Sequence, residues 1–138
     1  MVLTYKQKNE VRSAWSQYIG NYEWHIVGTT TYFQPTYTKR NRTLMEQTFN
    51  SISSINRMFF VSEYSGYSKN VHSHFLIHCD NPLNTIVKLK KKFDRLGKNQ
   101  IELVNNDPVM VNENGELKVG YYFTKHISND IDYDFLSK

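Results

Sequence analysis

The stretch VHSHFLIHC, residues 71–79, decides the expected fold, because its side chains alternate in character as they do along a β-strand. Successive side chains of a strand point to opposite faces of its sheet. One face then receives His72, His74, Leu76 and His78, and the other receives mainly apolar residues. We therefore expect a sheet whose apolar face is covered by helices and whose histidine face is open and carries a site.

The segments on both sides of this strand predict an α+β domain with an antiparallel sheet. Apolar spacing and turn residues predict a helix over 9–19, strands over 24–33 and 58–64, helices over 41–54 and 82–96, a strand over 101–104 and a short helix over 119–128. Without the first and last helices the order is βαββαβ, the ferredoxin-like plan that RRM domains share. We expect one domain over 1–138, with an N-terminal helical region over 1–20 and a frayed tail over 129–138.

The composition fits a folded protein of a reducing compartment with an anionic partner. The chain has 138 residues, one cysteine (Cys79) and a net charge of +4. A lone cysteine excludes an internal disulfide, and no apolar run reaches the length of about eighteen residues that a transmembrane helix needs. The positive charge suits a polyanion, and an aromatic fraction of 14% offers rings for stacking unpaired bases. We expect a cytoplasmic protein without a membrane partner.

Two histidines of the strand and a carboxylate on the preceding strand predict a metal site. His72 and His74 lie about 7 Å apart along a strand, so both imidazoles can bind one ion. The short loop before Val71 predicts an antiparallel hairpin that brings Glu63 across from them. Two imidazoles and one carboxylate form a mixed nitrogen and oxygen site with open positions, which suits Mn²⁺ or Mg²⁺. His78 lies about 13 Å further along and is not expected to join.

The expected helix over 119–128 carries a candidate nucleophile. Tyr122 and Lys125 are three residues apart and share one helix face, whereas Tyr121 points about 100° away. A phenol attacks poorly because its pKa is about 10. A nearby cation and a phosphate polarised by a metal ion both assist it. The alternative is that one of the two tyrosines packs in the core and the other lies at the surface, so this segment alone leaves the role of Tyr122 open.

Together these residues resemble the HUH endonucleases, specifically the small rolling-circle replication initiators of plasmids and single-stranded DNA viruses. Members carry three ordered motifs, whose candidates here are VGTTTY at 27–32, HSHFLI at 72–77 and YFTK at 122–125. Glu63 is similar to the family's third metal ligand. Ser73 departs from the bulky hydrophobic residue that the family usually has at that position. The chain has no P-loop, so any helicase is expected to come from the host or from a longer fused protein.

The resemblance implies a metal-dependent enzyme that nicks single-stranded DNA at a replication origin or hairpin. The ion on Glu63, His72 and His74 would orient the scissile phosphate. Tyr122 would attack it, giving a 5′-phosphotyrosine link and a free 3′-hydroxyl, and a second strand end could reverse the step. Lys125 would screen the phosphate or assist deprotonation of the phenol. Candidate DNA contacts are Thr29, Thr31, Tyr32, Arg40, Arg42, Tyr67, Lys69, Lys91 and Lys92.

Two other functions fit parts of the sequence. A single-tyrosine transposase of the same superfamily also places His-x-His before a helical tyrosine, and cleavage of a hairpin-flanked transposon end would distinguish it. A non-enzymatic ferredoxin-like module would instead stack nucleic-acid bases on its sheet face and need no metal. Such modules carry aromatic residues where this chain has His72 and His74. The sequence predicts no particular oligomeric state.

Overall fold

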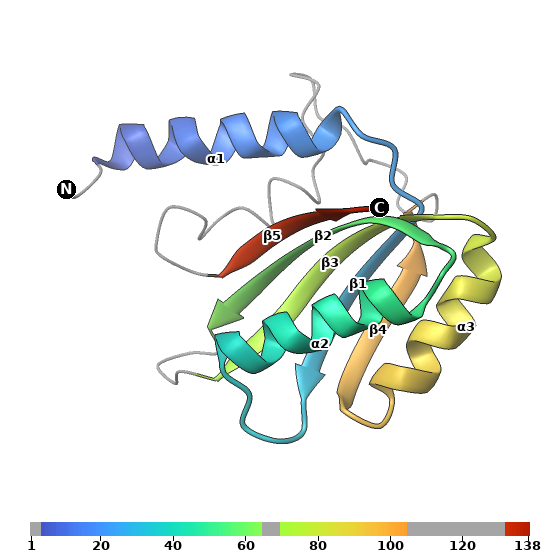
Figure 1. The fold of residues 1–138 in the computed structure, drawn as a ribbon. Helices are drawn as coiled ribbons and strands as arrows, with labels where there is room; N and C mark the ends of the chain where they lie inside the picture. Colours follow the sequence, from blue (N-terminus) through green and yellow to red (C-terminus); the bar gives the residue numbers. More distant parts are fainter. Residues whose placement is uncertain (1–3, 65–69, 105–131) are drawn as a thin grey trace.

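The chain folds as one five-stranded sheet with helices on both faces, seen in a computed structural model that describes residues 4–64, 70–104 and 132–138 (Figure 1). In chain order the elements are α1 Tyr5–Gly20, β1 Ile26–Tyr32, α2 Thr38–Ser51, β2 Ile55–Tyr64, β3 Val71–Cys79, α3 Pro82–Phe93, β4 Gly97–Leu103 and β5 Tyr133–Ser137. The strands lie in the order β4-β1-β3-β2-β5, and all neighbouring pairs are antiparallel. The expected α+β class is therefore confirmed. None of the described helices is long and apolar enough to span a membrane.

Several elements begin earlier than their apolar patterns indicate. Helix α1 begins at Tyr5 because Thr4 caps it: the Thr4 hydroxyl accepts from the Gln7 amide at 3.1 Å, and the Gln7 side chain accepts from the Thr4 amide at 2.9 Å. Helix α2 begins at Thr38, and strand β2 begins at Ile55. The strand over 71–79 and its antiparallel hairpin with β2 are confirmed as predicted.

The expectation of a frayed C-terminal tail is wrong, because Tyr133–Ser137 form strand β5 at the edge of the sheet beside β2. Side chains of opposite character alternate along it. The rings of Tyr133 and Phe135 pack with the α1 side of the sheet, and the carboxylate of Asp134 points to Arg42 on α2. Strand β5 therefore makes contacts on both of its faces. Residues 119–128, where a tyrosine helix is predicted, lie outside the described residues.

The face of the sheet opposite the histidines is covered by α2 and α3 (Figure 1). Its core contains the buried side chains of Met45, Phe49, Phe60, Phe75, Leu89 and Phe93, among others. A glycine in β1 permits one of these contacts, since a Cβ on Gly28 would lie 2.2 Å from the Phe75 ring. The apolar alternation of β3 thus faces the helices, as predicted.

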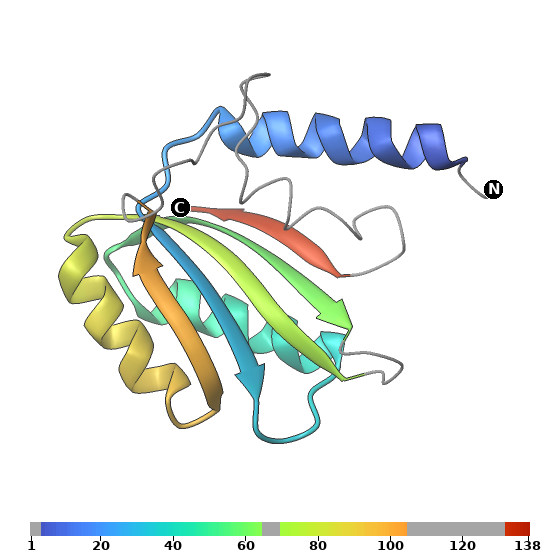
Figure 2. The same cartoon turned by 180° about the vertical axis from the view of Figure 1, so that it is seen from behind.

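The histidine face is not open along its whole length, which corrects the expectation that all helices lie on the other face. Helix α1 lies on this side of the sheet beside β5 (Figure 2), and Leu76 and Phe59 are fully buried in the cluster that contains Ile19 of the helix. Trp15 of α1 stacks on the Phe59 ring with centroids 6.3 Å apart. Leu76, which lies between His74 and His78 along β3, belongs to the same apolar cluster as Ile19 of this helix. The buried Leu76 therefore separates His72 and His74 from His78 on this face.

Candidate metal centre

The β2–β3 hairpin brings the three predicted metal ligands together. Glu63 is the register partner of His72, and Val61 is the partner of His74. The Nε2 atom of His74 lies 3.0 Å from one Glu63 carboxylate oxygen, and the Nε2 atom of His72 lies 3.8 Å from the other. The two imidazole centroids are 4.9 Å apart. The predicted juxtaposition of Glu63 with the His-x-His pair is therefore confirmed.

Burial makes this arrangement chemically demanding. Glu63 is only 7% exposed and His74 only 4%, whereas His72 is half-buried. Removing a carboxylate from water is costly unless a positive partner or hydrogen bonds compensate it. Two imidazoles compensate the carboxylate only when they donate hydrogen to it, and a divalent cation would do so more strongly. The more exposed His72 leaves one side of the cluster accessible.

Thr29 holds the buried histidine from behind. It is the register partner of His74 across the β1–β3 pair, and its hydroxyl lies 3.0 Å from His74 Nδ1. A hydroxyl can donate or accept, so it can hold the hydrogen of Nδ1 and leave a lone pair on Nε2 facing Glu63. Thr29 was expected to contact DNA, and the structure places it against the candidate ligand. This role follows from strand pairing between distant segments, for which the sequence has no local signal.

The donor set fits a divalent cation. One ligand atom from each of Glu63, His72 and His74 lies within 4.8 Å of the others. Atoms bound to one ion at about 2.1 Å lie roughly 3–4 Å apart, so only a small contraction is needed. Three protein ligands leave positions open for a substrate oxygen and water. Nitrogen and oxygen donors together accept Mn²⁺ and similar ions.

A second group of the same composition lies at the far end of β3, where the sequence suggested an isolated His78. Glu23, His25 and His78 also offer ligand atoms within 4.8 Å of one another. The His25 and His78 rings lie with centroids 4.6 Å apart. The signal for His25 is again antiparallel register, because Ile26 pairs with Ile77 and the next residues outward meet.

The neighbours of this second group differ from those of the first. Nδ1 of His25 accepts a hydrogen bond from the Cys79 amide at 3.1 Å, and Nε2 of His25 lies 3.4 Å from a Glu23 oxygen. Arg57 is the register partner of His78 and donates to the Glu23 carbonyl at 3.0 Å. Burial, followed by the charge of Arg57 and the nearby His25, lowers the pKa of His78 below its usual value. A cationic side chain, Arg57, therefore already lies beside this group.

Of the predicted DNA contacts, Tyr32, Lys91 and Lys92 lie on the helix side of the sheet, and only Lys91 among these is exposed. Tyr32 points to the helix-covered face, where its hydroxyl donates to Asn41, and burial raises the pKa of its phenol. Lys91 and Lys92 lie on α3, on the face away from the cluster, and burial lowers the pKa of Lys92. Tyr67, Lys69, Tyr122 and Lys125 lie outside the described residues.

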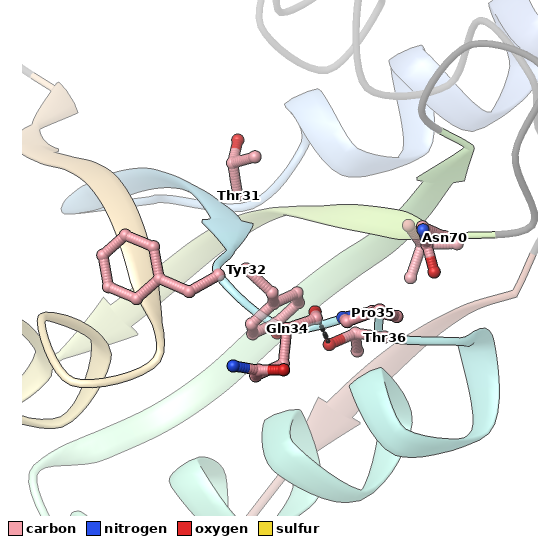
Figure 3. A pocket seen from close by; sticks show the side chains of 8 residues that line it. Thr31, Tyr32, Gln34, Pro35, Thr36 and Asn70 are labelled. Carbon is pink, nitrogen blue, oxygen red and sulfur yellow. Dashed lines mark hydrogen bonds between the residues drawn. The ribbon is translucent and has the colours of Figure 1, made fainter.

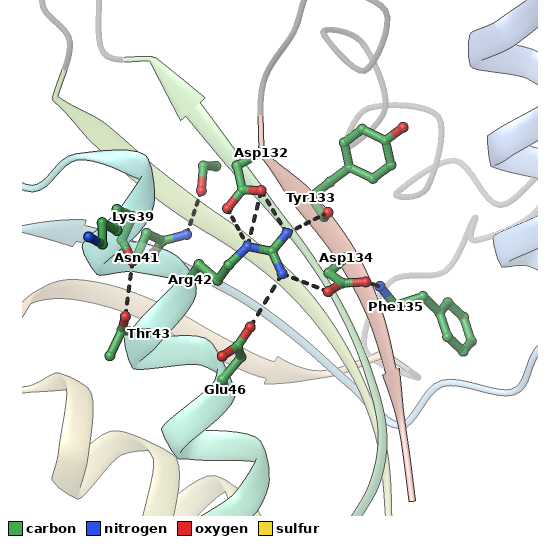
Figure 4. Close-up of polar contacts among 10 residues, drawn as sticks. Lys39, Asn41, Arg42, Thr43, Glu46, Asp132, Tyr133, Asp134 and Phe135 are labelled. Atoms are coloured by element: carbon green, nitrogen blue, oxygen red, sulfur yellow. Dashed lines mark hydrogen bonds and ion pairs between the residues drawn. The ribbon is translucent and has the colours of Figure 1, made fainter.

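Arg42 has its charge balanced within the protein (Figure 4). Its guanidinium bonds Asp132 at 2.7 Å, Asp134 at 2.7 Å and Glu46 at 3.3 Å. The hydrogen bond to Asp132, with those to Asp134 and Glu46, raises the pKa of Arg42. Arg42 thus joins α2 to β5 rather than facing solvent as a single positive charge. Of the other candidates, Thr31 and Arg40 are exposed.

Comparison of the chain with protein-family models, with curated proteins and with solved structures found no match.

Proposed function

We propose that this protein is a metal-dependent, single-stranded DNA nicking and joining endonuclease of the HUH type. The observation that carries the proposal is the buried Glu63, packed against His72 and His74 at an accessible end of the sheet. The βαββαβ order of β1 to β4 and the position of the pair on a central strand support it. A purely stacking nucleic-acid module would gain nothing from burying a carboxylate between two histidines.

Each residue of the cluster has a distinct task in the proposed reaction. A divalent cation, when bound, would polarise the scissile phosphate and stabilise the charge that develops on it. Glu63 supplies the negative charge that retains the cation, and Thr29 fixes the His74 ring so that Nε2 faces inward. Tyr122 would form the new oxygen–phosphorus bond while the bond to the 3′-oxygen breaks, and that oxygen leaves as a hydroxyl after taking a proton.

The described residues at the C-terminal edge of the sheet contact the strand that carries Glu63. The described structure resumes at Asp132, whose carbonyl accepts a hydrogen bond of 2.8 Å from the amide of Ser62. Ser62 immediately precedes Glu63, so Asp132 bonds the residue next to a candidate ligand. Arg42 holds this point through Asp132 and the carbonyl of Tyr133 (Figure 4).

The test is formation of a covalent protein–DNA adduct. We expect labelled single-stranded oligonucleotides carrying origin-like hairpins to give an adduct with Mn²⁺ on denaturing gels, and none after chelation. Tyr122→Phe should abolish it. Glu63→Gln should reduce it by at least about a hundredfold, because removal of the metal's Lewis-acid effect costs several kcal/mol in the transition state. Glu23→Gln, the matched change at the other end of β3, should leave the rate unchanged.

Two outcomes would contradict the proposal. One is the absence of any adduct across the oligonucleotide panel with Mn²⁺ or Mg²⁺. The other is an adduct that survives both Tyr122→Phe and chelation. Under the proposal the reaction initiates rolling-circle replication, so origin hairpins should be cleaved in preference to transposon ends.

A further inference from the structure

A cavity of about 250 Å³ lies between the end of β1 and the start of β3, and its lining includes Val71, which precedes the candidate ligand His72 (Figure 3). It is lined by Thr31, Tyr32, Phe33, Gln34, Pro35, Thr36, Asn70 and Val71. Pockets for drug-sized ligands run from about 300 to 1,000 Å³, so this one suits a single flat ring system. Its lining combines aromatic rings, hydroxyl groups and side-chain amides.

The wall of the cavity is tied to the strand that carries the candidate ligands. The amide of Val71 donates to the Thr36 carbonyl at 2.8 Å, and Val71 directly precedes His72. The Thr36 side chain is buried, and its hydroxyl donates to the Gln34 carbonyl at 3.0 Å (Figure 3). These bonds give the loop a defined shape and join it to the residue that precedes His72.

The exposed groups of this loop match the chemistry of an unpaired base. The Phe33 ring is 61% exposed, although burial would normally be favourable for it. An exposed ring at a cavity mouth can stack on a base. The Gln34 amide is exposed and offers both a donor and an acceptor, the pair needed to bind the edge of a base.

Positively charged side chains lie on the first turn of α2, which follows this loop in the sequence. A second cavity, of about 380 Å³, is lined by Tyr37, Lys39, Arg40 and Thr43. Lys39 and Arg40 are exposed, in contrast to Arg42, whose charge is balanced by carboxylates. Tyr37, which lines the second cavity, is 58% exposed and directly follows Thr36 of the first. Cations next to exposed rings suit a phosphate backbone with its bases unstacked.

We propose that the cavity at Phe33 and Gln34 holds one unpaired base of the DNA strand, next to the nucleotide whose phosphate lies at the metal centre. Lys39 and Arg40 contact the phosphates that follow it. This inference rests on the proposed function, since it identifies how the same site grips its substrate. It replaces Tyr32, which points to α2, with Phe33 as the stacking residue of this region.

The test measures DNA binding with EDTA present, so that it does not depend on cleavage. A fluorescent 12-nucleotide strand, selected from a random pool by its tight binding, is scanned with one abasic position at a time. We expect one position to weaken binding about 5- to 150-fold, as loss of one stacked base does. Phe33→Ala and Phe33→Leu should weaken binding by a similar factor, whereas Phe33→Tyr should retain it. Leu83→Ala removes an equally exposed apolar residue of α3 and should have no effect.

The decisive result is the combination of the two changes. In Phe33→Ala the abasic strand should bind no more weakly than the intact strand, because the partner of the base is already missing. The base pocket is refuted if the losses of affinity caused by Phe33→Ala and by the abasic position multiply. It is also refuted if Phe33→Ala binds DNA as tightly as Leu83→Ala does. Tighter binding of a matched RNA strand overturns DNA as the occupant. If an adduct forms but the two changes show no coupling, the nickase proposal is supported and the base pocket is refuted. If the two changes are coupled but no adduct forms, the base pocket is supported and the nickase proposal is refuted.

Discussion

The strand β3 has two imidazoles and a carboxylate at each of its ends, and the two groups differ in their surroundings. Near its start, the buried carboxylate of Glu63 lies against the imidazoles of His72 and His74. Its negative charge would attract a cation bound between these three side chains. At its end, the Glu23 side chain is 75% exposed, and the Arg57 guanidinium already supplies positive charge beside His78. Only the first group calls for an added cation.

The two groups also differ in the hydrogen bond made by the Nδ1 atom of one histidine in each, His74 in the first and His25 in the second. Behind His74 is the hydroxyl of Thr29, which can donate or accept, so Nε2 can offer its lone pair to a metal ion. Behind His25 is the amide of Cys79, which only donates. The neutral His25 ring must then carry its hydrogen on Nε2, where it faces Glu23 and cannot bind a metal. Identical residue types therefore have an Nε2 lone pair available at one end and a hydrogen on Nε2 at the other.

The largest expected effect that distinguishes the two ends is stabilisation by metal. Ligand at a hundred times its Kd raises the free energy of unfolding by about 2.7 kcal/mol, so Mn²⁺ should raise the melting temperature by several degrees. Glu63→Gln and His74→Ala should lose this shift, and Glu23→Gln and His78→Ala should keep it. Differential scanning calorimetry checks this. A shift that disappears in Glu23→Gln, or persists in Glu63→Gln, would refute the assignment of the metal to the first group.

The next effect concerns the hydroxyl behind His74. Thr29→Val preserves the shape of the side chain but removes the group that fixes the imidazole. We expect the Mn²⁺ affinity, measured by titration calorimetry, to fall about 10- to 100-fold, as it does when outer partners of metal ligands are lost. Thr29→Ser should retain most of it. Equal affinities for the valine and serine variants would show that the hydroxyl is not needed.

A smaller effect is expected on the protonation of His78. Its pKa is lowered by burial and then by the charge of Arg57, while Glu23 and Asp80 act in the opposite direction. In Arg57→Met the pKa should rise toward the ordinary value of about 6.5, measured by NMR titration of the ring protons. If the pKa of His78 is the same in Arg57→Met as in the unmodified protein, the charge of Arg57 does not act on His78.

The smallest effect is on the pH dependence of stability. Because the pKa of His78 is lower in the folded protein, the unfolded chain binds more protons as the pH falls below about 6.5. Stability should therefore decrease on acidification from that point, with no contribution from His78 at higher pH. His78→Gln should decrease the slope between about pH 6.5 and the folded pKa in urea unfolding experiments. An unchanged slope would mean that another group causes the acid loss.

The sequence by itself determined the local features of this protein. Alternation over 71–79 decided which face receives His72 and His74, because side chains along a strand have a period of two residues. The short loop before Val71 brought Glu63 across from His72, since a hairpin joins residues that are near in sequence. The α+β class and the order of β1 to β4 followed from similar periodicities.

Only the tertiary structure decided the features that depend on contacts between distant segments. Thr29 and His25 meet β3 through the register of β1, which is fixed by long-range packing such as that of Phe75 over Gly28. The cover of α1 over Leu76 and the pairing of β5 with β2 depend on the assembled apolar faces and on the Arg42 ion pairs. Local sequence patterns cannot specify these contacts, because their energy arises from surfaces that exist only once the sheet has formed. They nevertheless decide how the surroundings of the two similar histidine groups differ in burial, hydrogen bonding and nearby charge.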